Sequence, residues 1–184
     1  MIVVQLSGGL GNQMFQYATG RALAARHGAQ LVFDSSWIEG ESGDVYELGC
    51  FQLEARLAPV EQVGRLQRSL LPSRRPVLRE AGPDPLQSPD NTYLRGSWET
   101  LTHVEEAEAQ LRRDFVFRPA IVEEHAALAR EIQESPVPTV SLHVRRPGTL
   151  EPEYYSHALD ALGYGSAVFA SSSSPTIPIG ARRT

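Results

Sequence analysis

The amino-terminal stretch constrains the fold more than any other part of the chain, because an apolar run leads through glycines into a helical pattern. The apolar run occupies residues 2–6, and the sequence Ser-Gly-Gly-Leu-Gly follows it at residues 7–11. Apolar side chains then recur at helical spacing over residues 13–27, and Gly28 provides a stop signal. Such a unit presents backbone N–H groups at a helix N-terminus, where a phosphate binds favourably. We expect Asn12 to be the N-cap of this helix.

The glycines alone leave the kind of loop open. A dinucleotide-binding fingerprint has the pattern G-x-G-x-x-G, and Met14 stands where the third glycine would follow Gly9 and Gly11. A P-loop is excluded because no Gly-Lys-Ser/Thr follows, and the chain contains no lysine. The remaining alternative is a tight strand-to-helix turn that binds no ligand.

A second apolar run, at residues 30–34, follows the predicted helix. A strand, a helix and a second strand in this order favour the parallel sheet of an α/β fold. Asp34 closes the second strand roughly 25 residues after the glycines, near where a dinucleotide-binding enzyme places the acid that binds a ribose. The alternative interpretation is an ordinary polar residue at a strand end.

Composition narrows the class of protein. The 184 residues suffice for one domain, or for one domain and a piece of another. A net charge of −5 provides no general basic field for nucleic acid. Cys50 is the only cysteine, so it forms no disulfide within the chain, and we expect a buried thiol. No signal peptide and no apolar run of about 20 residues is visible, so a cytoplasmic setting is expected, with membrane association not visible in the sequence.

The rest of the chain alternates between helical, extended and irregular patterns. The pattern predicts a helix over residues 59–71, an irregular excursion over 72–89, a strand over 92–96, helices over 103–113 and 119–134, a break over 135–138 and a strand over 139–144. The break is a candidate linker between domains.

Two adjacent arginines, Arg145 and Arg146, follow the last predicted strand directly. Open α/β sheets bind ligands at the carboxyl ends of their strands. A guanidinium group binds phosphate in a bidentate manner, so this pair suits a diphosphate. Solvent-exposed arginines are the alternative on the dipeptide alone, and His143 by itself is typical of a packed histidine.

Three stretches together resemble the alpha-1,2-fucosyltransferase family (glycosyltransferase family 11). They are Gly-Gly-Leu-Gly-Asn-Gln-Met-Phe-Gln-Tyr-Ala at residues 8–18, His-Val-Arg-Arg at 143–146 and Glu-Tyr-Tyr at 153–155, in a region where family members have a Tyr-Tyr helix. The chain departs from the family where Pro147-Gly148 replaces a Gly-Asp pair, so the role of that Asp is vacant unless Glu151 partly takes it.

The resemblance implies a GT-B architecture, in which two Rossmann-like domains hold a sugar nucleotide in the cleft between them. The chain would then supply the N-terminal half and the start of the second domain. We expect an N-terminal Rossmann-like domain at 1–137, the start of a donor-binding domain at 138–164 and a disordered or frameshifted tail at 165–184. Family likeness ends inside the expected strand near residue 168, and the serine-rich segment that follows is too polar to order itself.

The resemblance also implies a reaction: inverting, metal-independent transfer of L-fucose from GDP-fucose to the 2-hydroxyl of a terminal galactoside, with no cofactor. Negative charge grows on the β-phosphate as fucose leaves, and a fixed guanidinium there stabilises the transition state. We expect Arg145 to take this role, with Arg146 and His143 beside it. The donor-binding residues would be Gly9, Gly11, Asn12 and Gln13. The sequence does not identify the catalytic base, for which Asp34 and Glu99 are candidates.

Two other functions remain open. A non-catalytic remnant of the family would at most bind GDP weakly. An NAD(P)-binding protein would use Gly9, Gly11 and Asp34.

Overall fold

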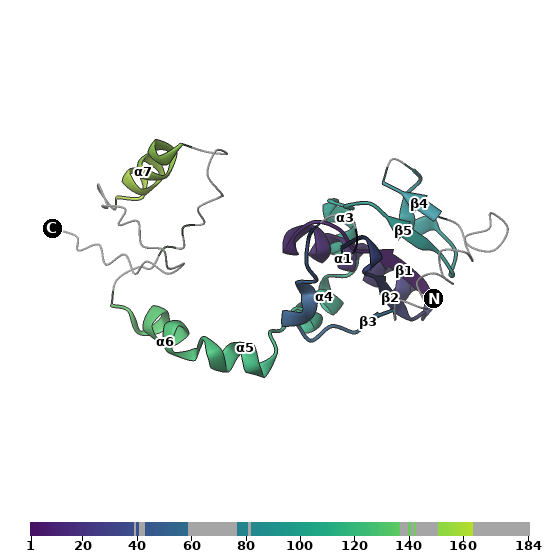
Figure 1. The fold of residues 1–184 in the computed structure, drawn as a ribbon, viewed down its shortest axis with the longest axis horizontal. Helices are drawn as coiled ribbons and strands as arrows, with labels where there is room; N and C mark the ends of the chain where they lie inside the picture. Colours follow the sequence, from purple (N-terminus) through teal and green to yellow (C-terminus); the bar gives the residue numbers. More distant parts are fainter. Residues whose placement is uncertain are drawn as a thin grey trace. The chain divides into compact units, whose positions relative to one another are not determined.

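The computed structural model describes residues 1–38, 40, 43–58, 77–80, 82–136, 140, 142 and 151–163. The chain divides into two compact units, residues 1–130 and residues 131–184, and each is described by itself (Figure 1). The expected helix over 59–71, nearly all of the expected strand over 139–144 and the tail at 165–184 lie outside the described residues. The expected domain boundary at residue 137 stays a prediction.

The first unit is built on a parallel sheet, as the strand-helix-strand beginning of the sequence predicted. Its five strands lie in the order β3-β2-β1-β5-β4, and every neighbouring pair is parallel. The strands are β1 (Ile2–Gln5), β2 (Leu31–Asp34), β3 (Arg56–Leu57), β4 (Val77–Arg79) and β5 (Tyr93–Arg95). The structure is therefore an α/β fold whose parallel sheet is compatible with a Rossmann-like fold.

One long helix lies between the first two strands, and the other named helices come after the last strand. The long helix α1 (Leu10–His27) connects β1 to β2 and ends at Gly28, whose φ of 58° lies in the left-handed region that glycine favours. The others are α3 (Leu101–Glu106), α4 (Glu108–Asp114), α5 (Pro119–Glu124), α6 (Ala126–Glu134) and α7 (Pro152–Ala161). Helix α7 contains the Tyr-Tyr pair of the expected helix. Among the described residues, no helix is long and apolar enough to cross a membrane.

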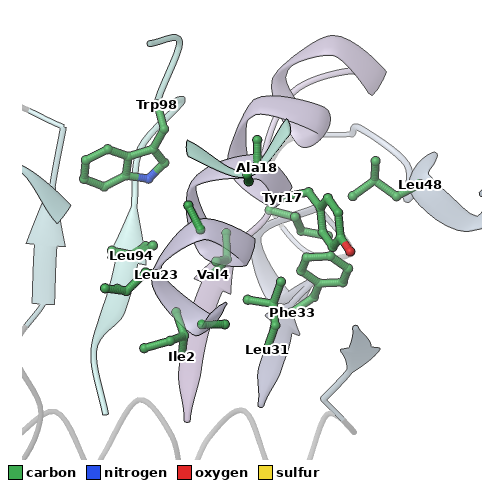
Figure 2. Packing of buried hydrophobic residues seen from close by; sticks show 14 of the residues in the cluster. Ile2, Val4, Tyr17, Ala18, Leu23, Leu31, Phe33, Leu48, Leu94 and Trp98 are labelled. Carbon is green, nitrogen blue, oxygen red and sulfur yellow. The ribbon is translucent and has the colours of Figure 1, made fainter. Parts of the chain in front are cut away.

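The main core lies between α1 and one face of the sheet. Figure 2 shows Tyr17, Ala18 and Leu23 of α1 over side chains from β1, β2 and β5. Gly20 lets the helix approach closely, because a Cβ at this position would lie 2.5 Å from Val4 Cγ2 and 2.8 Å from Leu31 Cδ1. A smaller buried cluster covers the opposite face and consists of Val3, Val32, Ala58 and Tyr93.

The structure corrects several expectations at the level of single elements. Helix α1 begins at Leu10 with Gly9 as its N-cap, so Asn12 is not the N-cap. The region expected to be irregular contains β4, because its backbone pairs with β5 and its Leu78 joins the main core. The helix expected over 103–113 is two helices that meet at Ala107, and the helix expected over 119–134 is interrupted at His125.

Cys50 also differs from expectation. The thiol is half-buried rather than buried, in a short 3₁₀ helix spanning Leu48–Cys50. It packs beside the main core rather than within it.

Candidate functional site

The candidate site lies at the carboxyl edge of the sheet, where β1 and β5 are neighbours. In the sheet, β1 lies between β2 and β5. Strands β2 and β3 extend the sheet on one side of β1, and β5 and β4 extend it on the other, so the direction of winding reverses between β1 and β5. Open α/β sheets bind ligands outside such a reversal, at the carboxyl ends of the strands. The loops that meet there are residues 7–9, after β1, and residues 96–100, after β5.

Gly8 gives the first loop its shape. Its φ of +70° is a conformation that L side chains rarely adopt, and a Cβ at this position would lie 2.5 Å from Asn12 Nδ2. The side chain of Asn12 thus folds back over the loop. No hydrogen bond of Asn12 to another residue that the structure describes is found, so its amide is available to a ligand.

Gly9 and Gly11 behave differently from Gly8. A Cβ on Gly9 would make only an ordinary contact, 3.5 Å from Glu47 Oε2, and a Cβ on Gly11 would meet no atom within 4 Å. The N-terminus of α1 has no side-chain cap and no acidic residue in its first turn. A helix leaves its first N–H groups without intrahelical partners, so this end of α1 offers backbone donors to an anion.

Gln13 is fully buried and acts within the chain. Its Nε2 donates to the carbonyl oxygens of Gly8, at 2.8 Å, and of Val45, at 2.7 Å. Its Oε1 accepts from the N–H of Glu47 at 3.0 Å. With its amide bound on both sides, Gln13 positions the glycine loop against residues 45–47.

Gln16, one helical turn further on, joins the two loops of the site. Its Oε1 accepts from the N–H of Ser7 at 3.1 Å, and its Nε2 donates to Ser7 Oγ at 2.9 Å and to the carbonyl oxygen of Gly96 at 3.1 Å. Both glutamines are fully buried. Gln13 and Gln16 therefore fix the positions of the loops that form the site.

A carboxylate already lies against the glycine loop. Asp44 Oδ2 accepts from the N–H of Gly8 at 3.0 Å. An anionic ligand that enters this loop therefore meets a negative charge at Gly8, and its favourable contacts lie with the donors of residues 9–12.

The loop after β5 is held by Glu80, which follows β4. Its Oε2 accepts from the N–H of Ser97 at 3.0 Å, and its Oε1 accepts from the N–H of Trp98 at 3.2 Å. Trp98 has a φ of +58°, which is strained for a bulky residue. Its indole Nε1 is buried and has no hydrogen-bond partner among the described residues.

Asp34 is engaged inside the fold. It is fully buried, its Oδ2 accepts from the hydroxyl of Tyr93 at 2.6 Å, and its Oδ1 accepts from the N–H of Ser36 at 2.9 Å. A carboxylate held this way closes the strand end and ties β2 to β5. Because Asp34 is fully buried, a ribose could not reach its carboxylate without local opening of the fold, which disfavours the NAD(P) interpretation. Glu99, the other candidate base, is exposed on the loop after β5.

Three of the predicted donor-binding residues, Gly9, Gly11 and Asn12, lie at the N-terminal end of α1. The fourth, Gln13, is fully buried and is bonded to residues 8, 45 and 47, so its amide holds the loop. The predicted catalytic residues Arg145, Arg146 and His143 lie outside the described residues, so their placement stays a prediction. Within the described ranges, no three His, Cys, Asp or Glu side chains gather as they would around a metal ion.

Sequence reasoning missed the roles of Gln16, Glu80 and Gly96. One signal was present: two glutamines three residues apart, at positions 13 and 16, on the helix face that also carries Tyr17 and Ala18. A polar side chain on a buried helix face needs a partner, so this spacing indicates hydrogen bonds to the neighbouring loops.

Comparison of the chain with family models, with curated proteins and with solved structures found no match in any of the three. The structure defines the class as an α/β protein with a parallel sheet of the Rossmann-compatible kind.

Proposed function

We propose that this chain is a glycosyltransferase that transfers L-fucose from GDP-fucose to the 2-hydroxyl of a terminal galactoside, with inversion and without a metal ion. The observation that carries the proposal is the open backbone at Gly11, at the carboxyl edge of the sheet beside the reversal of strand order. The resemblance of residues 8–18 and 143–146 to the alpha-1,2-fucosyltransferases supplies the reaction.

No packing among the described residues requires a glycine at position 11. An alanine here would meet no atom within 4 Å. It would also favour the helix by about 0.5–1 kcal/mol. A glycine at a position where alanine fits leaves the backbone open to a ligand that approaches from outside. A phosphate or sugar of the donor, bound to the N–H groups of the first turn and to Asn12, accounts for it.

The proposed chemistry assigns charge stabilisation to Arg145. As the bond from fucose to the β-phosphate breaks, a guanidinium aimed at that phosphate gains more in the transition state than in the ground state. Arg146 and His143 would support it. The proposed architecture is GT-B, with residues 1–137 as one Rossmann-like domain and residues 138–164 as the start of the donor-binding domain.

The binding half of the proposal is tested with Gly11→Ala and GDP. The variant should unfold at higher urea concentration, because alanine favours the helix, and should bind GDP more weakly, because the methyl group occupies the approach to the backbone. Ala25→Gly is the matched control: it lies on an exposed turn of α1, so it should lower stability and leave GDP binding unchanged. Unaltered GDP affinity in Gly11→Ala would contradict the proposed donor contact.

The reaction is tested by following fucose transfer from GDP-fucose to lactose. Arg145→Ala should abolish the transfer. Arg112→Ala is the control, since Arg112 is an exposed residue paired with Glu108 in the preceding turn. Undiminished transfer by Arg145→Ala would refute the assigned role. GDP binding with no turnover in the unaltered chain would instead support the non-catalytic remnant.

A further inference from the structure

Two arginines lie side by side on the carboxyl edge of the sheet. Arg79 of β4 and Arg95 of β5 are register partners in a parallel pair, and neighbouring strands are about 4.8 Å apart. Side chains at such positions point to the same face of a sheet. Both arginines therefore project from the same edge of the fold.

The face can be identified from the alternation along each strand. Leu78 and Leu94 belong to the main core beneath α1, so Arg79 and Arg95 point to the opposite face. Tyr93, two residues before Arg95, lies in the small cluster on that face. The pair is thus on the other side of the sheet from α1, next to the reversal between β1 and β5.

Neither arginine of the pair forms an ion pair with an acid among the described residues. The nearest acid in sequence, Glu80, directs both carboxylate oxygens to the N–H groups of residues 97 and 98. Asp34 on β2 accepts from Tyr93 and Ser36. Like charges directly opposite each other on neighbouring strands are destabilising.

Arg95 is held in place while Arg79 is exposed. The guanidinium carbon of Arg95 lies 5.8 Å from the ring centroid of Trp37, a cation–π distance. Arg95 is half-buried, so it loses little side-chain freedom when it binds a ligand. Arg79 is exposed, so its guanidinium group can rotate toward the same ligand. One fixed and one adaptable guanidinium provide up to four charge-assisted hydrogen bonds in bidentate geometry.

We propose that Arg79 and Arg95 form a binding site for a phosphate-class dianion. Two guanidinium groups without an ion-pair partner among the described residues suit a dianion, and their fork geometry matches phosphate oxygens. The proposal goes beyond the proposed function, which assigns the GDP phosphates to Arg145 and residues 9–12 and treats the galactoside as neutral. The bound group is either free phosphate or the phosphate of a substrate.

The test is titration calorimetry of the full chain with inorganic phosphate at low ionic strength and mildly alkaline pH, where phosphate is mostly the dianion. Arg79→Gln and Arg95→Gln should each weaken binding about tenfold, the effect of losing one charge-assisted contact, and the double variant should weaken it further than either single variant. Arg112→Gln, at an exposed arginine on α4, should bind like the unaltered chain. Acetate, a monoanion, should bind much more weakly than phosphate to the unaltered chain.

The outcomes separate this site from the proposed donor site. If Arg145→Ala keeps phosphate binding while Arg79→Gln weakens it, the pair is an independent site, whatever becomes of the fucosyltransferase proposal. If GDP competes with phosphate and Arg79→Gln weakens the binding of both, the site takes the phosphate of a nucleotide; if GDP does not compete, it takes another phosphate. Phosphate affinity that is unchanged in the double variant, or phosphate binding that is absent in the unaltered chain, overturns the proposal. If Arg95→Gln lowers stability, Arg79→Gln alone still tests the proposal, because Arg79 is exposed.

Discussion

Gln16 Nε2 donates a hydrogen bond to the carbonyl oxygen of Gly96, across 80 residues of sequence and 3.1 Å of space. This contact joins the loop after β5 to the helix that follows β1, at the place where the strand order reverses. The same side chain holds Ser7 through its backbone and hydroxyl. One buried amide therefore sets the spacing between the two loops of the candidate site.

Replacing Gln16 should weaken the fold more than a typical core change. Gln16→Ala removes a fully buried amide and leaves half-buried groups of Ser7 and Gly96 without partners, and we expect a loss of about 2–4 kcal/mol in the free energy of unfolding. Urea denaturation measures it. Exposed Gln87 provides the control, since Gln87→Ala should change stability by less than about 0.5 kcal/mol. A loss for Gln16→Ala as small as that of the control would show that the amide does not connect the loops.

Two glycines of the same helix should respond to alanine in opposite directions. Gly20→Ala places a methyl group against Val4 and Leu31, and overpacking of this kind costs about 1–3 kcal/mol, reduced by the helix preference of alanine. Gly11→Ala should instead stabilise the protein. The comparison is made by urea denaturation of both variants, and equal shifts of the same sign would contradict the packing at Gly20.

Stability should fall at alkaline pH because of Tyr17. Burial first, and then the hydrogen bond to Asp114 and its charge, raise the pKa of Tyr17 well above its ordinary value of 10.0. Its hydroxyl donates to Asp114 Oδ2 at 2.7 Å, and Arg21 Nε donates to the same oxygen at 2.9 Å. The raised pKa means that the unfolded chain releases this proton first as the pH rises. The stabilisation is thus complete below pH 10 and is lost as the pH rises above it.

The measurement compares urea midpoints at about pH 8 and about pH 10.5, on either side of the unfolded pKa. Tyr17→Phe should cost about 1.5–3 kcal/mol at the lower pH, because Asp114 loses a donor, and should show a smaller alkaline loss than the unaltered chain. Tyr154→Phe, at an exposed tyrosine of α7, should keep the full alkaline loss. An identical alkaline loss in Tyr17→Phe and the unaltered chain would disprove the assignment.

Trp98 should tolerate loss of its indole N–H. The Nε1 atom is buried and has no partner in the described part of the chain, and a buried donor without a partner costs about 1–3 kcal/mol. Trp98→Phe removes that penalty together with some apolar area, so we expect a net change within about 1 kcal/mol. Trp98→Ala should cost about 3–5 kcal/mol. Thermal denaturation distinguishes the variants, and a large loss in Trp98→Phe would indicate that the indole N–H has a partner.

The amino-terminal sequence determined the local elements and their class. The apolar run, the glycines and the helical spacing up to Gly28 predicted β1, α1 and β2 and the parallel sheet, because each signal depends on neighbouring residues. The turn at residues 7–11 was predicted for the same reason. Asn12 was misplaced as the N-cap because the helix start depends on the loop conformation at Gly8 and Gly9, which the residue types do not fix.

Tertiary structure decided which loops form the site and what its polar residues do. Gln16 contacts Gly96, and Arg79 lies opposite Arg95, only because β5 lies between β1 and β4. This strand order depends on pairing between distant segments. Asp34 resembled a ligand-binding acid in the sequence, yet its carboxylate is held by Tyr93 from a strand 59 residues away. A residue type sets the hydrogen bonds that a side chain can make; the fold sets which of them remain for a ligand.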